Sequence, residues 1–155
     1  MQRVAVSKWI EAPPQAVWDL YTDHVSWQRW ARLGSVRLTE VGSPERDGAG
    51  CVREISRLGF RVLEQVEAFE PPTRMTYRVV GGMFPVRNHL GLVEFSAEGT
   101  GTRVDWSCEF ESTIPGVSGV LRLIINKTFT DVLDRLSRVD FGDAAALGSS
   151  QEKLK

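Results

Sequence analysis

His89 is the side chain of this sequence best suited to proton chemistry. It lies in the stretch 88–110, NHLGLVEFSAEGTGTRVDWSCEF, where apolar and polar residues alternate, and it is one of only two histidines in the chain. Because an imidazole titrates near neutral pH, His89 suits a general acid or base, and it equally suits a wall residue that hydrogen-bonds a ligand oxygen. Both roles stay open, since the sequence shows no second group that is unmistakably catalytic.

Glu64 is the second candidate for proton transfer, because it shares a strand face with Val62 and Val66. A carboxylate that faces an apolar interior is costly unless it is paired. The cations available for such a pair are Arg53, Arg57, Arg87 and Lys8. The sequence therefore predicts a pair between Glu64 and an arginine at the mouth of a cavity, and the alternative is an exposed or edge position for Glu64.

Other side chains are candidates for lining a ligand site. Tyr77 shares a face with Met75 and Val79, and its hydroxyl can bond a ligand oxygen or lie at the rim of a core. Trp106 and Phe110 can stack on a flat ligand, although core packing explains them equally well. The inward parity of the neighbouring strand adds three further candidates, Val93, Phe95 and Arg87.

The segment 81–86, GGMFPV, combines flexible glycines with apolar residues between two predicted strands. A mobile apolar loop of this kind is typical of a lid or entrance for a lipophilic ligand. The alternative is a plain hairpin loop in which Met83 and Phe84 cap the end of a barrel. Met83 and Phe84 are ligand-lining candidates on the first interpretation.

Several kinds of chemistry lack their sequence motifs. No nucleophile elbow, phosphate-binding loop, zinc-protease motif or dinucleotide fingerprint occurs. Cys51 and Cys108 show no CxxC spacing and have no histidine close in sequence, which argues against a zinc site and a disulfide scaffold. We expect both to be small packing residues, and a single bridge between them is the alternative. The sequence predicts no metal and no cofactor.

Composition describes one ordinary globular domain. The chain has 155 residues, 42% of them apolar and 25% charged, with a formal net charge of -1. The basic residues are scattered, which argues against nucleic acid as a partner. The N-terminus lacks the pattern of a signal peptide and no run of 18 apolar residues occurs, so we expect a cytoplasmic protein without integral membrane association. For the oligomeric state we expect either a monomer or a homodimer.

Periodicity predicts the elements that must hold these side chains. The predicted helices cover 15–21, a short segment with Trp27 and Trp30, and 117–136, where apolar residues step by three or four. The predicted strands cover 4–10, 36–41, 51–58, 60–69, 75–80 and two runs within 88–110, joined by a turn of four or five residues at 97–101.

Alternation in the last two strands predicts which side chains face inward. In the last strand, one face carries Thr102, Val104, Trp106, Cys108 and Phe110. In its partner the same parity runs from Phe95 back through Gly91 to His89 and Arg87, unless a bulge near Gly91 changes the register. His89 is therefore predicted to face the space between the sheet and the final helix.

In order and spacing, several pieces resemble the START-like superfamily, also named SRPBCC, which includes polyketide cyclase/dehydrase and lipid-transport domains. The resembling pieces are IEAPPQAVW at 10–18, Asp23 with Trp27 and Trp30, EPPTRMTY at 70–77, GTRVDW at 101–106 and the closing helix, within residues 3–139. The resemblance implies an α+β helix-grip fold. In that fold a curved antiparallel sheet of six to seven strands wraps around the long C-terminal helix, with two short helices after the first strand and a hydrophobic cavity inside.

The resemblance implies no shared catalytic set, so function is predicted only broadly. We expect a single domain at 1–140 that binds a hydrophobic small molecule, such as a lipid, isoprenoid or aromatic polyketide, followed by a flexible tail at 141–155. The alternative is a polyketide cyclase/dehydratase, in which His89 or Glu64 moves a proton during aldol closure and loss of water.

Overall fold

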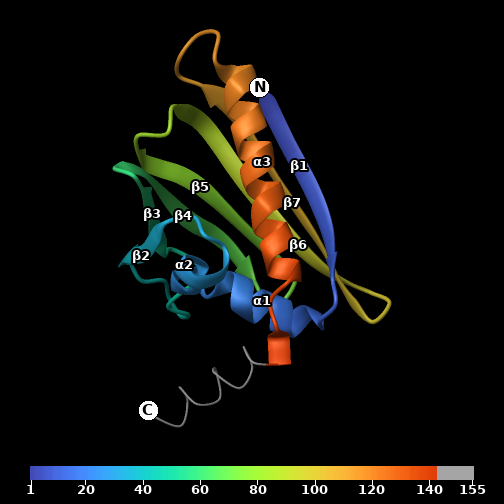
Figure 1. Cartoon of the computed structure of the whole chain (residues 1–155). Helices are drawn as coiled ribbons and strands as arrows, with labels where there is room; N and C mark the ends of the chain where they lie inside the picture. Colours follow the sequence, from blue (N-terminus) through green and yellow to red (C-terminus); the bar gives the residue numbers. More distant parts are fainter. Residues whose placement is uncertain (143–155) are drawn as a thin grey trace.

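The computed structural model describes residues 1–142 as one curved sheet with helices on its concave side (Figure 1). The strands are β1 (Gln2–Ile10), β2 (Ser35–Glu40), β3 (Val52–Arg57), β4 (Phe60–Glu70), β5 (Arg74–Gly82), β6 (Val86–Glu98) and β7 (Gly101–Ser112). The helices are α1 (Pro14–Thr22), the 3-10 turn η1 (His24–Ser26), α2 (Trp27–Trp30) and α3 (Ser118–Ser137).

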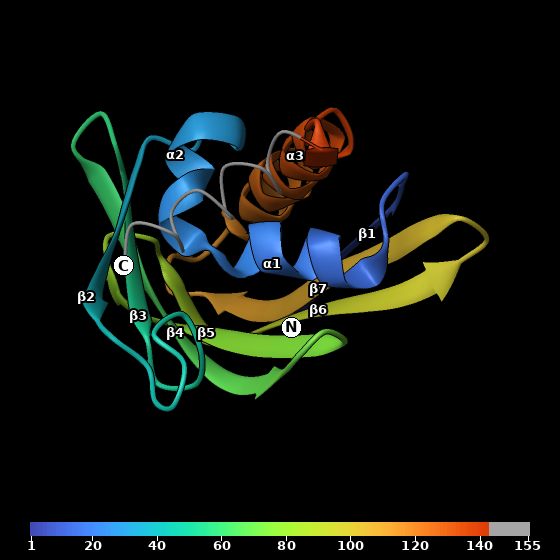
Figure 2. The same ribbon diagram turned by 90° about the horizontal axis from the view of Figure 1, so that it is seen from below.

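The sheet has seven strands in the order β1-β7-β6-β5-β4-β3-β2, and every neighbouring pair is antiparallel. From β2 to β7 the chain is a plain meander, while β1 returns to pair with β7 at the far edge. Figure 2 shows the sheet curving around α1, α2 and α3. The predicted helix-grip fold, with its two short helices after β1 and its long final helix, is confirmed.

Buried and exposed residues alternate along β7, which gives the sheet an apolar concave face. Its five predicted inward residues, from Thr102 to Phe110, are all buried, whereas Arg103 and Glu109 on the other face are exposed. An apolar concave face needs a cover, and α3 provides one by packing along β1 and β7. The buried stripe of α3 consists of Leu121, Ile125, Phe129, Val132, Leu133 and Leu136.

The hairpin between β6 and β7 is tighter than the sequence predicted. Glu98 pairs directly with Gly101, so only Gly99 and Thr100 form the turn. Gly99 has a φ of 61°, which glycine adopts at no steric cost and which suits a two-residue turn. A tight turn at Leu58 and Gly59, with φ values of 52° and 79°, also joins β3 to β4.

A bulge in β6 overturns the predicted inward position of Arg87. The pairing with β7 shifts between Arg87 and Leu90, and Asn88 takes a left-handed φ of 51°. The extra residue turns Arg87 to the outer face, where its Nε lies 3.0 Å from Oε2 of Glu111. His89, beyond the bulge, keeps the inward parity of Gly91 and is buried.

Residues 143–155, most of the tail expected from the sequence, lie outside the described residues. Within residues 1–142, no helix is both long enough and apolar enough to cross a membrane.

Candidate functional site

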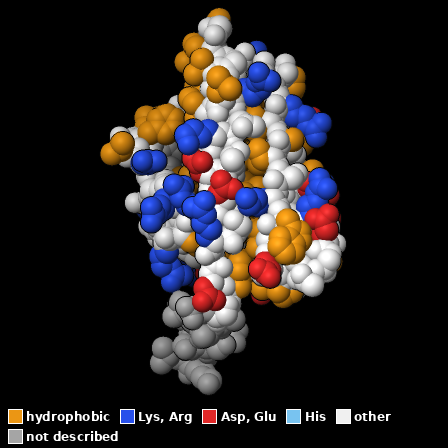
Figure 3. Space-filling view, turned by 45° about the vertical axis from the view of Figure 1, so that its right-hand side comes forward, with side chains coloured by type: hydrophobic (Ala, Val, Ile, Leu, Met, Phe, Trp, Pro, Cys, Tyr) orange, Lys and Arg blue, Asp and Glu red, His pale blue; other side chains and the backbone are white. Residues whose placement is uncertain are grey.

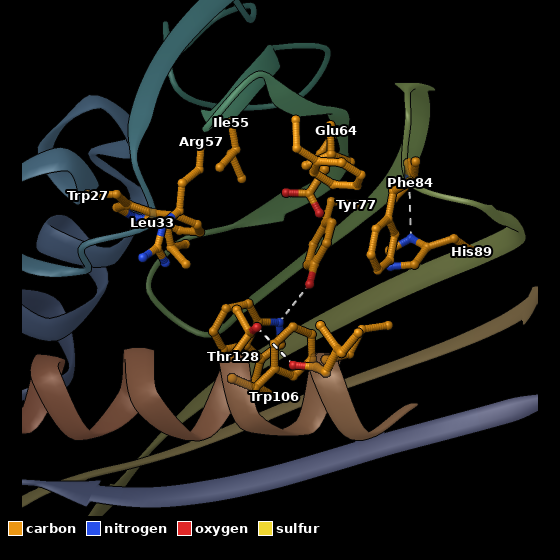
Figure 4. A pocket seen from close by; sticks show the side chains of 16 residues that line it. Trp27, Leu33, Ile55, Arg57, Glu64, Tyr77, Phe84, His89, Trp106 and Thr128 are labelled. Atoms are coloured by element: carbon orange, nitrogen blue, oxygen red, sulfur yellow. Dashed lines mark hydrogen bonds between the residues drawn. The ribbon is translucent and has the colours of Figure 1, made fainter. Parts of the chain in front are cut away.

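A pocket of about 340 Å³ opens where α3 leaves the middle of the sheet uncovered. Its walls come from β3, β4, β5, β6 and β7 on one side and from α2 and α3 on the other (Figure 4). The lining residues are Trp27, Leu33, Ile55, Arg57, Phe60, Val62, Glu64, Tyr77, Val79, Phe84, His89, Trp106, Ile124, Ile125, Thr128 and Phe129. The wall is therefore mainly aromatic and aliphatic, with polar groups at a few separate points.

Tyr77 and Trp106 form a polar contact inside this apolar wall. The indole Nε1 of Trp106 donates a hydrogen bond of 2.7 Å to the Tyr77 hydroxyl oxygen, and the Trp106 ring stacks on Phe129 with centroids 3.8 Å apart. Burial raises the pKa of Tyr77 well above its ordinary value, so the phenol keeps its proton. Since the oxygen already accepts from Trp106, this proton is free to be donated to a ligand oxygen.

Gly91 allows Tyr77 to lie flat across the neighbouring strand. The two residues are paired in the β5–β6 ladder, and a Cβ on Gly91 would lie 2.3 Å from Cζ of the Tyr77 ring. No other residue type fits under the ring without displacing it. Gly91 is thus the backbone feature that fixes the orientation of the phenol.

His89 presents a hydrogen-bond donor to the pocket. Its Nδ1 accepts the backbone N–H of Val79 at 3.2 Å, so the proton of the neutral ring lies on Nε2. Burial lowers the pKa of His89, with Arg53 and Arg78 acting in the same direction against Glu64. At neutral pH the ring is therefore a neutral donor, and its only unprotonated nitrogen is already occupied by the backbone.

Glu64 is paired with an arginine, as the sequence predicted, but the arginine is fully buried and does not lie at the mouth of the pocket. The Nε of Arg53 lies 3.0 Å from Oε1 of Glu64, and Arg53 has no exposed surface (0%). Its guanidinium lies between the rings of Trp27 and Tyr77, 4.6 and 4.7 Å from their centroids. Glu64 also lines the pocket, so its second carboxylate oxygen is available as an acceptor for a ligand.

Half of the predicted site residues meet in this pocket: His89, Glu64, Tyr77, Trp106 and Phe84. The other five lie elsewhere. Val93, Phe95 and Phe110 are buried in the core, with Phe95 edge-on to Trp18 and Tyr21. Met83 is 51% exposed at the β5–β6 loop, and Arg87 is on the outer face.

The sequence interpretation missed the part of the wall that comes from the helices and from β3. Trp27, which the sequence placed in a short helix and not among the site candidates, also faces the pocket. A hydrogen bond of 2.7 Å from its Nε1 to the carbonyl of Tyr21 holds it there. The three- and four-residue spacing of apolar residues in the last helix could have indicated its lining residues Ile125 and Phe129. Alternation in β3 could have revealed Ile55 and Arg57 in the same way.

A second buried cluster lies beside the pocket. Nδ1 of His24 is 3.3 Å from Oδ1 of Asp47 and 3.9 Å from Sγ of Cys51. Burial lowers the pKa of His24 to about 4 and raises that of Cys51 to about 11, so the thiol is not a nucleophile at neutral pH. Cys51 and Cys108 are both free and buried.

Among residues 1–142, no three His, Cys, Asp or Glu side chains are grouped so that they could hold a metal ion.

Comparison with known proteins gives a family match and many fold matches. The family described as "Polyketide cyclase / dehydrase and lipid transport" matches residues 1–139. No curated protein matches the chain.

Similar solved structures include XoxI from Bacillus cereus, with a TM-score of 0.72, 23% identity, and 89% of this chain and 94% of that chain covered. A protein from Thermobifida fusca has a TM-score of 0.72 at 19% identity, covering 90% and 96% of the two chains. Ara h 8.0201 has a TM-score of 0.69 at 13% identity, covering 88% and 94%. These similarities establish the fold.

Proposed function

Because the chain belongs to the polyketide cyclase/dehydrase and lipid transport family, we propose that it binds a compact hydrophobic small molecule in the pocket beside α3. The observation that carries the proposal is the pocket itself, about 340 Å³ with aromatic walls from both sheet and helices. Burial of apolar ligand surface there contributes roughly 25 cal/mol per Å² to binding.

Pocket size restricts the ligand. Pockets that bind drug-sized ligands span about 300–1,000 Å³, so a volume of about 340 Å³ is near the lower end. An aromatic polyketide, a short isoprenoid or a single short acyl chain fits this volume. A two-chain lipid does not.

Three polar groups would orient such a ligand. The Tyr77 hydroxyl and the His89 Nε2–H donate, while the free carboxylate oxygen of Glu64 accepts. A ligand with a carbonyl oxygen and a hydroxyl would match both kinds of partner, whereas a pure hydrocarbon would leave these buried polar groups without partners.

A cyclase/dehydratase activity is the second candidate, favoured by the presence of Glu64 in the same pocket as two donors. In that reaction Glu64 would take a proton next to a carbonyl, while Tyr77 and His89 would stabilise the resulting enolate oxygen. His89 is not placed to be the base, since its unprotonated nitrogen accepts the Val79 N–H. The test is the rate at which the His89→Gln and Tyr77→Phe variants convert a poly-carbonyl substrate. Rates equal to that of the parent protein would rule out this assignment of roles.

Binding is tested first by native mass spectrometry for co-purifying molecules and by titration with the neutral fluorescent dye N-phenylnaphthylamine. Thr128→Trp places an indole in the pocket from α3, and we expect it to weaken dye binding roughly tenfold or more by removing the space for the dye. Thr130→Trp is the matched control, because Thr130 is exposed on the same helix and does not line the pocket. Equal binding by the two variants would contradict the proposed site.

A further inference from the structure

Arg57 is a cation at the pocket wall that has no ionic partner within the chain as described. We propose that the ligand is an amphipathic anion, whose carboxylate or similar single negative group pairs with Arg57 at the mouth while its apolar body fills the pocket. The proposal rests on the proposed binding function and adds the charge and the orientation of the ligand.

Neighbouring arginines show why Arg57 is unusual. Arg37 and Arg61 each pair with Glu54, at 3.0 and 3.6 Å, and Arg53 pairs with Glu64 at 3.0 Å. Arg57 lies in β3, between the strands that carry Arg37 and Arg61. In residues 1–142, however, no carboxylate lies within ion-pair distance of Arg57. In β2, β3 and β4, the arginines that do not line the pocket therefore have carboxylate partners, and the one that lines it has none among the described residues.

Arg57 lies at the exposed end of the pocket. Its side chain is exposed, in contrast to the fully buried Arg53 on the same face of β3. Figure 4 shows Arg57 near Leu33 and Trp27, on the opposite side of the pocket from His89. A charged group bound at Arg57 keeps contact with water, so the ligand anion avoids most of the desolvation cost of full burial.

Glu64 sets the direction of the ligand. It faces Arg53 across the β3–β4 ladder, and Arg57 follows four residues later along β3, which is about 13 Å of extended strand. At that spacing Glu64 does not neutralise Arg57, and its pair with Arg53 leaves no uncompensated positive charge deep in the pocket that would attract an anion. The anionic end consequently lies at the mouth, and an uncharged polar group of the ligand reaches Tyr77 and His89.

The wider surface agrees with an anionic ligand. Figure 3 shows several Lys and Arg side chains gathered on the face drawn there, with fewer Asp and Glu side chains among them. A face on which basic side chains outnumber acidic ones raises the local concentration of an anion and speeds its association with the protein.

Two dyes with the same aromatic skeleton test the proposal. Anilinonaphthalene sulfonate carries one negative charge, while N-phenylnaphthylamine carries none. For Arg57→Gln we expect the affinity for the sulfonate dye to fall roughly five- to tenfold, with the affinity for the neutral dye unchanged, because only the charged dye loses a charge-assisted hydrogen bond. Arg57→Lys keeps the positive charge and should restore most of the binding of the sulfonate dye.

Arg61→Gln is the matched control, because Arg61 is an exposed arginine in the same hairpin that pairs with Glu54 and does not line the pocket. It should leave both affinities unchanged. If both dyes bind the parent protein but Arg57→Gln weakens them equally or not at all, the assignment of Arg57 is overturned while the binding function stands. If neither dye binds the folded parent protein, the binding function itself fails, and the assignment of Arg57 fails with it.

Discussion

Arg53 is the side chain on which the interior of the site depends most directly. It is fully buried and bonds Glu64 through Nε, while its buried Nη1 and Nη2 make no hydrogen bond to a described residue. A buried guanidinium is stable only while its charge is compensated, and here the compensation comes from Glu64 and from the faces of two aromatic rings.

Removing one partner of this pair should therefore cost more than removing both. We expect Glu64→Gln to lower the free energy of unfolding by about 3 kcal/mol, because it leaves the Arg53 charge buried without a carboxylate. The double change Arg53→Met with Glu64→Gln should recover most of that loss. Urea denaturation of the single and double variants checks this, and a double variant less stable than Glu64→Gln would contradict it.

His24 should make stability fall as the pH is lowered. Burial depresses its pKa from 6.5 to about 4, although the hydrogen bond with Asp47 opposes the shift. Between those two pH values His24 binds a proton in the unfolded chain and not in the folded chain. The free energy of unfolding therefore falls as the pH is lowered through this interval. The total loss is on the order of 3 kcal/mol once the pH is below about 4.

The measurement is the free energy of unfolding from pH 7 down to pH 4 for the parent protein and for His24→Gln. We expect the difference between the two to change by that amount over the interval, because the glutamine does not titrate. Parallel curves would show that His24 does not carry the effect. The pKa of His89 is also lowered by burial, and its contribution cancels in the difference.

At the scale of elements, β6 holds both the site and the feature that the sequence could not reveal. Alternation correctly predicted that His89, Val93 and Phe95 face inward, since a side-chain period of two survives as long as the ladder is regular. The bulge at Asn88 has no comparable signal, because one inserted residue changes parity without changing composition. For this reason Arg87 was placed on the wrong face.

Gly91, also in β6, gives a prediction for the contact between neighbouring strands. Gly91→Ala should lower the free energy of unfolding by about 1–3 kcal/mol, because the new methyl group forces the Tyr77 ring away and strains its bond with Trp106. Thermal melts and dye titrations measure the two effects. The control is Gly119→Ala in α3, where the added carbon meets nothing within 4 Å and no loss is expected.

At the scale of the whole molecule, the sequence was a better guide to the fold than to the site. The order of strands and helices follows from local periodicity, and each element was recognised within a few residues. The pocket, in contrast, depends on which side chains from distant elements meet. Trp27, Arg57 and Phe129 come from a short helix, a strand and the last helix, and no local pattern relates them.

The pairing of β1 with β7 affects how this chain reaches its native state. Gln2 lies opposite Phe110 and Ile10 opposite Thr102, so the first strand pairs with residues that follow about 90 to 110 positions later in the chain. Until this pairing forms, β1 has no neighbour in the sheet, and α3, which packs on β1 and β7, has no complete surface to cover. Folding is therefore governed by contacts of long sequence separation, which slows it and prolongs the time during which apolar strands are exposed to aggregation.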